Sequence, residues 1–337
     1  MIIEKLKKYW FFVGVGIVIY IAFQASFVGI FIKENYILKV TIFLVFVISG
    51  LELNTKNFTE EIKKIKNVLT VLFSSFIMFP VVAYFLAHYF FRLEQELLVS
   101  ASILATSPVT IASGMVLTRL AKGNVPLSLF ICILTNIVGI FTIPLSLNLM
   151  LQSEIRVELP ILDMLLKLVI LVLIPILFGQ LLQHPFPNIA KKYKKAFSIF
   201  SQCIILLMIL SAISSSIDRI STLGVMIIYI ALFILILHIL IVVLNYFIAH
   251  FVGYDKAARK ALVLHSSQKT LNVSFVVWNK FFSTAYPMAL ILPIIYHITQ
   301  NIVGTFIANY WGKNMEEKLK KRYRSCKFFL LKHNFFG

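Results

Sequence analysis

The sequence predicts an all-α membrane protein of ten transmembrane helices, arranged as two inverted five-helix repeats. Three observations lead to this fold class: the composition, the length of the apolar runs and a repeated tetrapeptide. Of the 337 residues, 60% are hydrophobic and only 14% are charged, and the mean hydropathy is +0.91. A soluble domain of this length needs more polar residues to cover its surface, so the chain is interpreted as an integral membrane protein.

The apolar runs predict helices rather than strands. A helix needs about 20 residues to cross a hydrocarbon layer of about 30 Å, and runs such as 165–182 and 225–247 lack the alternation of a barrel strand. The first run follows a basic stretch and has no convincing cleavage site, so it is expected to be a retained helix. The predicted spans are 9–26, 37–53, 68–87, 97–117, 125–150, 160–182, 197–214, 222–250, 260–279 and 287–311.

These spans define one transmembrane domain over residues 1–311, with repeats at about 9–150 and 160–311. A basic tail follows at 312–337. Most lysine and arginine residues lie in alternate links, on the side of the N-terminus, which is the excess that cytoplasmic links carry. Both termini are therefore predicted to be cytoplasmic. The low alanine content, with abundant Lys, Ile, Phe and Asn, suggests a bacterial inner membrane, whereas a eukaryotic source would mean an internal membrane.

The formal net charge of +18 does not predict a nucleic-acid partner. The basic residues lie where membrane topology and anionic cytoplasmic lipids would place them, so we expect anionic lipids at the basic loops and tail. The tail mixes basic and apolar residues, and it is interpreted either as lying along the inner headgroups or as a solvated segment. Cys132, Cys203 and Cys326 are too few and too scattered for a disulfide framework or a metal site.

The repeated tetrapeptide is Asn-Ile-Val-Gly, at 136–139 and again at 301–304. The copies lie about half a chain length apart, in the fifth and tenth predicted spans, and a Phe follows two residues after each Gly. Five spans per half is an odd number, so a duplicated second half would be inverted in the membrane, as in secondary transporters with a midplane site. The alternative is a chance match in a chain rich in Ile and Val.

The fourth predicted span contains Pro108, which removes a backbone donor and clashes with the preceding turn. Four flanking hydroxyl groups can supply replacement hydrogen bonds, so we predict a break near mid-depth. Those residues are Thr106, Ser107, Thr110 and Ser113.

The ninth predicted span has no proline, but seven of the eight residues from 265 to 272 are polar. Open backbone and polar side chains at membrane depth are tolerated only where protein or a water-filled cavity surrounds them. The fourth and ninth spans are therefore predicted to line one shared polar site.

Lys269 is the most informative residue of that site. A cation near mid-membrane costs several kcal/mol unless it is paired, deprotonated or hydrated, and the acidic residues fall almost wholly in links and tails. Three interpretations stay open: Lys269 snorkels or donates to carbonyl groups of the broken helix, it attracts an anion, or it exchanges its proton during transport. His265, one turn earlier, is the histidine expected to matter, whereas His238 and His297 are interpreted as packing or hydrogen-bonding residues.

Four stretches resemble the bile acid:sodium symporter superfamily, in particular its bacterial branch similar to the seventh member of the human solute carrier 10 family. They are SGLELNT at 49–55, PVTIASGMVLTRLAKGN at 108–124, LTNIVGIFTIPL at 134–145 and SSQKTL at 266–271. The similarity covers nearly the whole chain. It implies a panel of helices 1, 2, 6 and 7 beside a core of helices 3, 4, 5, 8, 9 and 10, with broken helices 4 and 9 crossing at the substrate and sodium region.

The resemblance also implies a change in that region. In sodium-coupled members, helix 9 carries a Glu four residues before a Gln-Asn pair, and the corresponding residues here are Leu264, Gln268 and Lys269. An anionic sodium ligand is lost and a fixed cation is gained, so we hypothesise that Lys269 stands in for bound sodium. If sodium does bind, the expected ligands are Ser113, Ser128 and Gln268; Cys132 stands where a hydroxyl ligand is frequent, and Ser75 where a Gln is frequent.

The predicted function is secondary transport of a small organic anion or amphipathic solute, with sodium or a proton left open as the coupling ion. The alternative is a membrane regulator of calcium homeostasis without transport of its own. No enzyme motif or catalytic nucleophile is recognised, so neither enzymatic activity nor a cofactor is expected. The predicted substrate- and ion-binding residues are Ser75, Thr106, Ser107, Pro108, Thr110, Ser113, Ser128, Asn136, His265, Ser267, Gln268, Lys269, Asn272 and Asn301.

Overall fold

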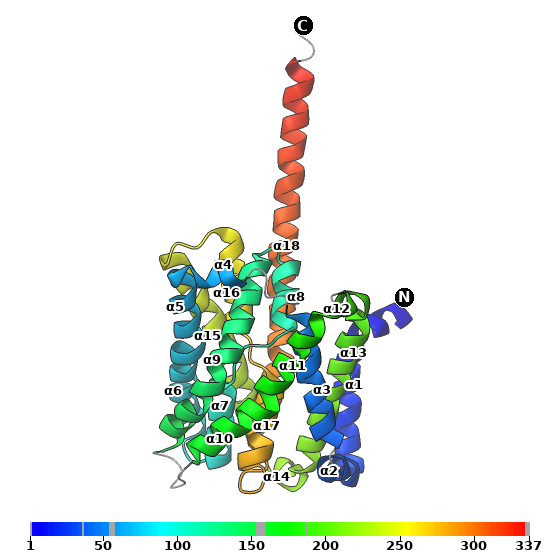
Figure 1. Ribbon diagram of the computed structural model, residues 1–337, viewed down its shortest axis with the longest axis vertical. Helices are drawn as coiled ribbons and strands as arrows, with labels where there is room; N and C mark the ends of the chain where they lie inside the picture. The colour runs from blue at the N-terminus through cyan, green and yellow to red at the C-terminus, as the bar shows by residue number, and fades with distance from the viewer. Residues whose placement is uncertain (1, 36, 54–57, 153–158, 187, 334–337) are drawn as a thin grey trace.

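The computed structural model describes residues 2–35, 37–53, 58–152, 159–186 and 188–333. Within these ranges the regular elements are all helical (Figure 1), as the composition predicts. Those of the first half are α1 (Ile2–Gln24), α2 (Ser26–Glu34), α3 (Ile37–Glu52), α4 (Phe58–Ile62), α5 (Ile65–Phe73), the π-helical turn η2 (Ser74–Met78), α6 (Phe79–Phe91), α7 (Gln95–Thr106), α8 (Ser113–Leu120) and α9 (Val125–Leu151).

The elements of the second half follow after the link at 152–160. They are α10 (Ile161–Leu168), the π-helical turn η3 (Val169–Leu173), α11 (Ile174–Gln183), α12 (Ile189–Lys192), α13 (Lys194–Ser214), α14 (Ile217–Ser221), α15 (Met226–Phe251), α16 (Lys256–Ser266), α17 (Leu271–Val277), the π-helical turn η4 (Trp278–Phe282) and α18 (Ile291–His333).

Six or seven stretches of the described chain have the length and apolar character of a membrane span. Seven are counted when α1 and α2, bent by 98°, form one span. The other three predicted spans are helical but shorter or interrupted, since α3 has 16 residues and the fourth and ninth spans are broken. The six continuous stretches are Ile65–Phe91, Val125–Leu151, Ile161–Gln183, Lys194–Ser214, Met226–Phe251 and Ile291–Lys313.

The first and the last helix end at other residues than the predicted spans. The first helix stops at Gln24, and the chain turns into α2, where a link was expected. Beyond the turn, Gly29 lets α2 lie close to α13, because a Cβ there would overlap Ser214. At the other end, α18 continues past residue 311 to His333 and extends beyond the other helices (Figure 1). Its added residues contain no proline and are rich in Lys, Glu and Leu, which favour helix. The side chains that decide between a headgroup-bound and a solvated tail lie outside the described ones.

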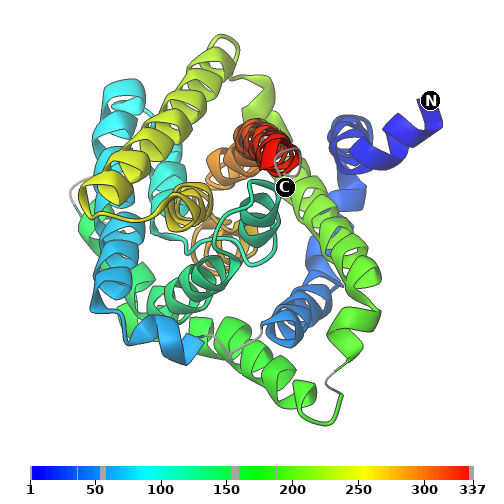
Figure 2. The ribbon, with the colours of Figure 1, turned by 90° about the horizontal axis from the view of Figure 1, so that it is seen from above.

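The helices form two groups, which Figure 2 shows from above. One consists of α1, α2, α3, α11 and α13. In it, α3 and α11 cross closely because Gly50 and Gly179 face each other's backbone, and a Cβ on either would overlap the opposite helix. The other group has α5, α6 and α15 on its outside and α7, α8, α9, α16, α17 and α18 toward the centre. We name these the α3–α11 group and the α7–α16 group.

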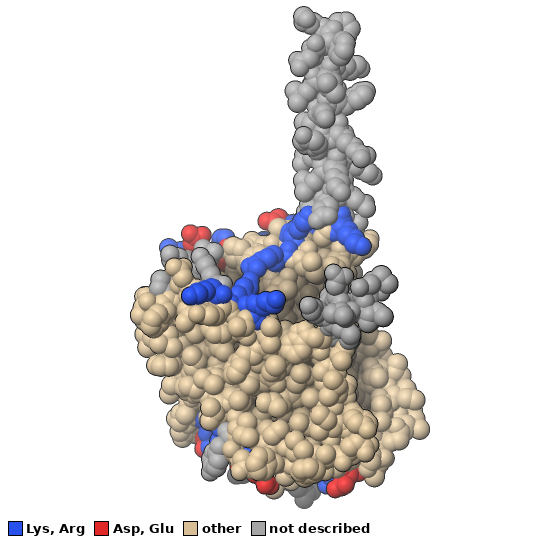
Figure 3. Space-filling model, turned by 90° about the vertical axis from the view of Figure 1, so that its right-hand side faces the viewer, with Lys and Arg blue, Asp and Glu red and all other residues tan. Residues whose placement is uncertain are grey.

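Charged side chains gather at the two ends of the molecule. On the face in Figure 3, lysine and arginine lie mainly at the end from which α18 extends, and the band between the ends is free of charged side chains. This distribution matches a hydrocarbon layer around the middle of the molecule.

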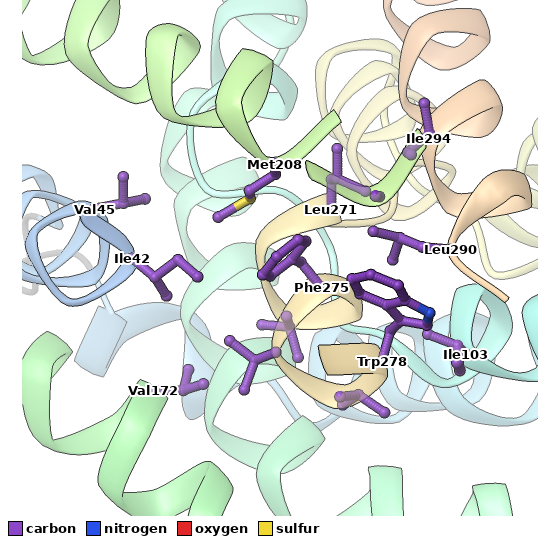
Figure 4. Packing of buried hydrophobic residues seen from close by; sticks show 14 of the residues in the cluster. Ile42, Val45, Ile103, Val172, Met208, Leu271, Phe275, Trp278, Leu290 and Ile294 are labelled. Atoms are coloured by element: carbon purple, nitrogen blue, oxygen red, sulfur yellow. The ribbon is translucent and has the colours of Figure 1, made fainter. Parts of the chain in front are cut away.

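The contact between the two groups is apolar (Figure 4). Phe275 of the ninth span lies on the side of Met208 of α13 and Ile42 of α3, and all three are buried in one cluster. Trp278 belongs to the same cluster and lies toward Ile103 and Leu290. Because dispersion and hydrophobic contacts have little directionality, this interface restrains the relative position of the groups less than a hydrogen-bonded one would.

Candidate functional site

Two helix breaks meet inside the α7–α16 group. The first, at 107–112, separates α7 from α8, where Pro108 predicted an interruption. The second, at 267–270, separates α16 from α17. The Thr270 amide donates to the Pro108 carbonyl oxygen at 2.9 Å, and the hydroxyls of Ser107 and Ser274 lie 2.7 Å apart. Each break therefore supplies partners for the other, as buried open backbone requires.

Lys269 lies at this crossing, with 1% of its surface exposed. Its Nζ donates to the carbonyl oxygens of Ser107 at 2.7 Å, Ala105 at 2.8 Å and Ser75 at 3.1 Å. The same atom lies 4.2 Å from the centroid of the Phe79 ring, a cation–π contact. A lysine ammonium has exactly three N–H groups, and a neutral amine has two. Three carbonyl acceptors therefore fit the charged form.

The three carbonyl groups are free because their helices cannot use them. Ala105 and Ser107 lie at the end of α7, where the helical donors are missing. Ser75 lies in the turn η2. There the Phe79 amide donates to Ser74 instead of Ser75, and residue 80 is a proline without an N–H. The π-helical turn and Pro80 together leave the Ser75 carbonyl to Lys269.

Gln300 of α18 fixes the backbone of Lys269. Its Oε1 accepts from the Lys269 amide at 2.7 Å, and its Nε2 donates to the Lys269 carbonyl at 2.9 Å. The sequence prediction named the neighbouring Asn301 instead, but Asn301 donates to the His297 carbonyl within its own helix. The sequence did contain a signal for Gln300, because it is a polar residue directly before the repeated tetrapeptide in an apolar helix.

A second cluster lies between the breaks and α8. Gln268 Oε1 accepts from the hydroxyls of Thr110 at 3.0 Å and Ser113 at 2.6 Å. The three side chains come from different breaks or helix ends, so this cluster ties α8 to the ninth span. Gln268 Nε2 is buried and has no hydrogen-bond partner within the described chain.

His265 extends this cluster toward α9. Its Nε2 lies 2.8 Å from the Thr110 carbonyl oxygen, and its Nδ1 lies 2.6 Å from the Ser128 hydroxyl. Since a carbonyl only accepts, Nε2 carries the hydrogen, and the Ser128 hydroxyl donates to Nδ1 of the neutral ring. Ser128 in turn accepts from Thr118 at 3.1 Å. Gly114 provides the space, because a Cβ there would overlap the His265 ring.

A third set of contacts surrounds Ser267. Its hydroxyl accepts from Asn245 of α15 at 3.1 Å, and its carbonyl accepts from the Tyr296 hydroxyl at 2.8 Å. Asn245 also accepts from Ser74. The sequence prediction missed Asn245 and Tyr296, although an Asn inside a long apolar helix is itself a signal of a polar contact.

Some of the remaining predicted residues reach the breaks, and others bond only within their own helix or have no partner in the described chain. Asn136 donates to the Val109 carbonyl at 3.2 Å and so reaches the first break. The hydroxyl of Thr106 donates to Ser102 within α7. Ser75 contributes its carbonyl, whereas its hydroxyl is buried without a partner in the described chain, as is Oδ1 of Asn272.

The residues expected to hold sodium are occupied within the protein. Ser113 donates to Gln268, and Ser128 bonds His265. The described residues contain no group of three or more His, Cys, Asp or Glu side chains arranged for a metal ion, and Lys269 forms no ion pair with an acidic residue among them.

Comparisons with known proteins agree with the predicted resemblance. The model of the SBF-like CPA transporter family matches residues 9–313. The sodium/bile acid cotransporter 7-A of Xenopus laevis is 24% identical, covering 95% of this chain and 97% of its own length. The probable sodium/metabolite cotransporter BASS4 of chloroplasts in Oryza sativa subsp. japonica is 28% identical, covering 83% and 70%. The uncharacterized sodium-dependent transporter YocS of Bacillus subtilis is 22% identical, covering 90% and 92%.

The family match covers most of the chain, and it includes both helix breaks and Lys269. With the apolar helices and the charge-free band, this is a multi-pass membrane protein, and it is a transporter rather than an enzyme. The chain belongs to the SBF-like CPA transporter family.

Proposed function

We propose that the protein is a secondary transporter of a small organic anion or amphipathic solute, in which the Lys269 ammonium takes the place of a coupling cation. The observation that carries this proposal is the contact of Lys269 with three freed carbonyl oxygens at the crossing of the two breaks. The relatives are named for bile acid and for metabolites, and a bile acid is an amphipathic anion.

The carbonyl contacts support independence from sodium. A hard cation is bound by several oxygen atoms at close range, and the carbonyls of Ser75, Ala105 and Ser107 already accept from the ammonium. A sodium ion a few ångströms away would also meet its repulsion, which a low-dielectric interior strengthens. The ammonium offers an anion the attraction that bound sodium would otherwise provide.

Lysines at the opposite end from α18 support an anionic solute. Around the turn η4, Lys33 of α2 lies 4.9 Å from the Trp278 ring, and Lys167 of α10 lies 5.1 Å from the Phe281 ring. Lys280 belongs to the same turn. Three lysines from three elements therefore lie around one turn. Lys167 is paired with Asp163 at 2.7 Å, so Lys33 and Lys280 supply the charge that raises the local concentration of anions.

The repeated tetrapeptide supports ten spans in two inverted repeats. A Cβ on Gly139 would lie 3.2 Å from Pro108, at the first break, and a Cβ on Gly304 would lie 3.3 Å from Gln268, at the second. Each repeated glycine thus lies beside the break of its own half, and Gly304 also lies against Leu117 of α8, at 2.6 Å from the position of a Cβ. We assign the α3–α11 group to the panel and the α7–α16 group to the core. The apolar contact between them suits a relative movement that gives alternating access.

The basic end supports a location in a bacterial inner membrane with both termini cytoplasmic. Lysine and arginine gather where α18 extends (Figure 3), and cytoplasmic segments carry this excess. Anionic lipids are the corresponding partners at that end.

Thermal unfolding of the purified protein tests the proposal. Wild type should be stabilised by an organic anion from a panel that includes a bile acid, and sodium should have no effect, because ligands stabilise only the state that they bind. Proteoliposomes that contain the protein should equilibrate the same anion across their membrane without added sodium. Lys269→Ala should lose the response, and Lys195→Gln, an exposed lysine of α13, is the control.

A double variant keeps the test decisive if Lys269→Ala fails to fold. Leu264→Glu with Lys269→Asn restores the residue pattern of the sodium-coupled members, so it should gain stabilisation by sodium. Sodium stabilisation of wild type would refute the role of Lys269. If the protein transports none of the tested anions but modulates calcium flux, the alternative of a membrane regulator is favoured.

A further inference from the structure

An apolar groove lies on the outside of the α7–α16 group, away from Lys269. Its volume is about 580 Å³. Helices α15 and α18 form its walls, and α16 contributes Val263. The lining residues are Val242, Val243, Tyr246, Phe247, Val263, Phe306, Ile307, Tyr310 and Trp311. We name it the α15–α18 groove.

The groove lies near the basic end of the molecule. Its lining residues belong to the last turns of α15, which ends at Phe251, and to the stretch of α18 just before Lys313. Tyr246, Tyr310 and Trp311 are the residue types that settle at the headgroup level of a membrane. One end of the groove is therefore at the interface, and its apolar length points into the hydrocarbon layer.

Two cations contact lining residues at that end. The Arg259 guanidinium lies 5.4 Å from the Tyr246 ring. Lys260 Nζ donates to the Ala121 carbonyl oxygen at 2.6 Å and to the Trp311 carbonyl oxygen at 3.5 Å. Arg259 also donates to the Tyr254 carbonyl at 3.3 Å. A guanidinium has five N–H groups. The Nε of Arg259 is buried, so a phosphate would bond the terminal N–H groups that Tyr254 leaves unused.

We propose that the α15–α18 groove binds one anionic phospholipid of the leaflet at the basic end, with an acyl chain along the groove and the phosphate at Arg259 and Lys260. Apolar walls admit the chain, and the cations at one end distinguish an anionic from a neutral headgroup. This site is separate from the proposed solute site, so neither proposal depends on the other.

The bound lipid would stabilise the ninth span by packing against α16. Val263 of α16 lines the groove, and its carbonyl accepts from the Ser267 hydroxyl at 2.6 Å. Ser267 begins the break that carries Lys269. A bound acyl chain therefore packs against the helix turn that holds this break, and it should stabilise the folded transporter.

Native mass spectrometry and thermal unfolding test the site with phosphatidylglycerol and phosphatidylcholine of identical acyl chains. Wild type should bind one phosphatidylglycerol in preference to phosphatidylcholine and unfold at a higher temperature with it. Arg259→Gln should weaken phosphatidylglycerol binding about fivefold, the effect of one interfacial charge. Lys256→Gln removes an exposed charge from the start of the same helix, and it should leave binding unchanged.

Val243→Trp tests the groove itself, since a larger side chain at this lining position would block the acyl chain. It should reduce binding of both lipids while keeping both cations. Equal binding of the two lipids by wild type would overturn the proposal, as would unchanged binding by Arg259→Gln and Val243→Trp. Displacement of the lipid by the bile acid would assign the groove to the solute instead.

Discussion

Lys269 shows how a single residue can hold a charge at membrane depth without a carboxylate. Each of its three N–H groups meets a carbonyl oxygen, and an aromatic face covers it. Hydrogen bonds to charged groups contribute about 1.5–3 kcal/mol each, so three of them offset much of the cost of burial. Donation to carbonyl groups of a broken helix was one of the three interpretations that the sequence left open, and Ala105 and Ser107 supply such groups. The third acceptor, the Ser75 carbonyl of another helix, was not expected.

Gly114 offers a test of the His265 cluster. We expect Gly114→Ala to displace the His265 ring, since the new Cβ would overlap it. Overpacking of this kind costs about 1–3 kcal/mol, and the contacts to Thr110 and Ser128 would be lost with the ring. The temperature of thermal unfolding and the rate of anion uptake should both decrease.

Gly16→Ala is the matched control, because nothing lies within 4 Å of a Cβ at Gly16. A methyl group there should leave unfolding and uptake close to wild type. Equal behaviour of the two variants would show that the contact between α8 and His265 is unimportant.

At the scale of elements, the turn η2 and Pro80 act together. The turn shifts the Phe79 amide to Ser74, and the proline withholds the next donor. Neither feature alone would free the Ser75 carbonyl. This local distortion of the helix provides a hydrogen-bond acceptor for Lys269, which is distant in the sequence. π-Helical turns are frequent at functional sites.

Pro80→Ala should therefore weaken the site. The new N–H can occupy the Ser75 carbonyl, and Lys269 would lose an acceptor. Loss of one such hydrogen bond corresponds to about a tenfold change in an equilibrium, so we expect solute binding and uptake to fall by about that factor.

The chain contains a matched control for Pro80. Pro175 follows the turn η3 at the same spacing, and Ile174 donates to Val169 just as Phe79 donates to Ser74. No lysine approaches the carbonyl of Ile170 in the described contacts. Pro175→Ala should change helix geometry without changing uptake, and equal loss in both variants would contradict the assigned role of Pro80.

The elements also show what the sequence could predict. Pro108 and the polar run at 265–272 predicted both breaks, because proline and clustered polar side chains are local signals. Gln300 and the Ser75 carbonyl were missed, since their roles depend on contacts between distant helices. The bend after Gln24 was also missed, and the helix that follows it packs on α13 through Gly29, a contact between distant segments.

For the whole molecule, the apolar composition predicted a helical membrane protein, and four sequence stretches that resemble a known family predicted its family. Six to seven spans follow from helix length and composition. Broken spans escape such a criterion, because the polar residues that make them functional also shorten the apolar runs. A criterion based on helix length and hydropathy therefore misses the broken helices that carry the proposed site.

The distribution of charge over the molecule gives a further prediction. Lys280→Gln should raise the KM for an organic anion about two- to fivefold at low ionic strength, because it removes a cation from the cluster around η4. The difference should vanish at about 1 M salt, where the Debye length is about 3 Å. Lys195→Gln, at an exposed position of α13, should have no effect on KM at either salt concentration, and a salt-independent effect of Lys280→Gln would point to a structural role.

If Lys269 replaces a coupling cation, as proposed above, its covalent attachment has an energetic consequence for the direction of transport. A sodium ion leaves its carrier and brings its gradient to each cycle, whereas a lysine returns with the empty site. The net charge moved per cycle is then that of the solute alone. A membrane potential that is negative inside favours outward movement of one negative charge by about 2.3 kcal/mol per 100 mV. A carrier with a tethered cation in place of sodium would therefore favour export of an anion.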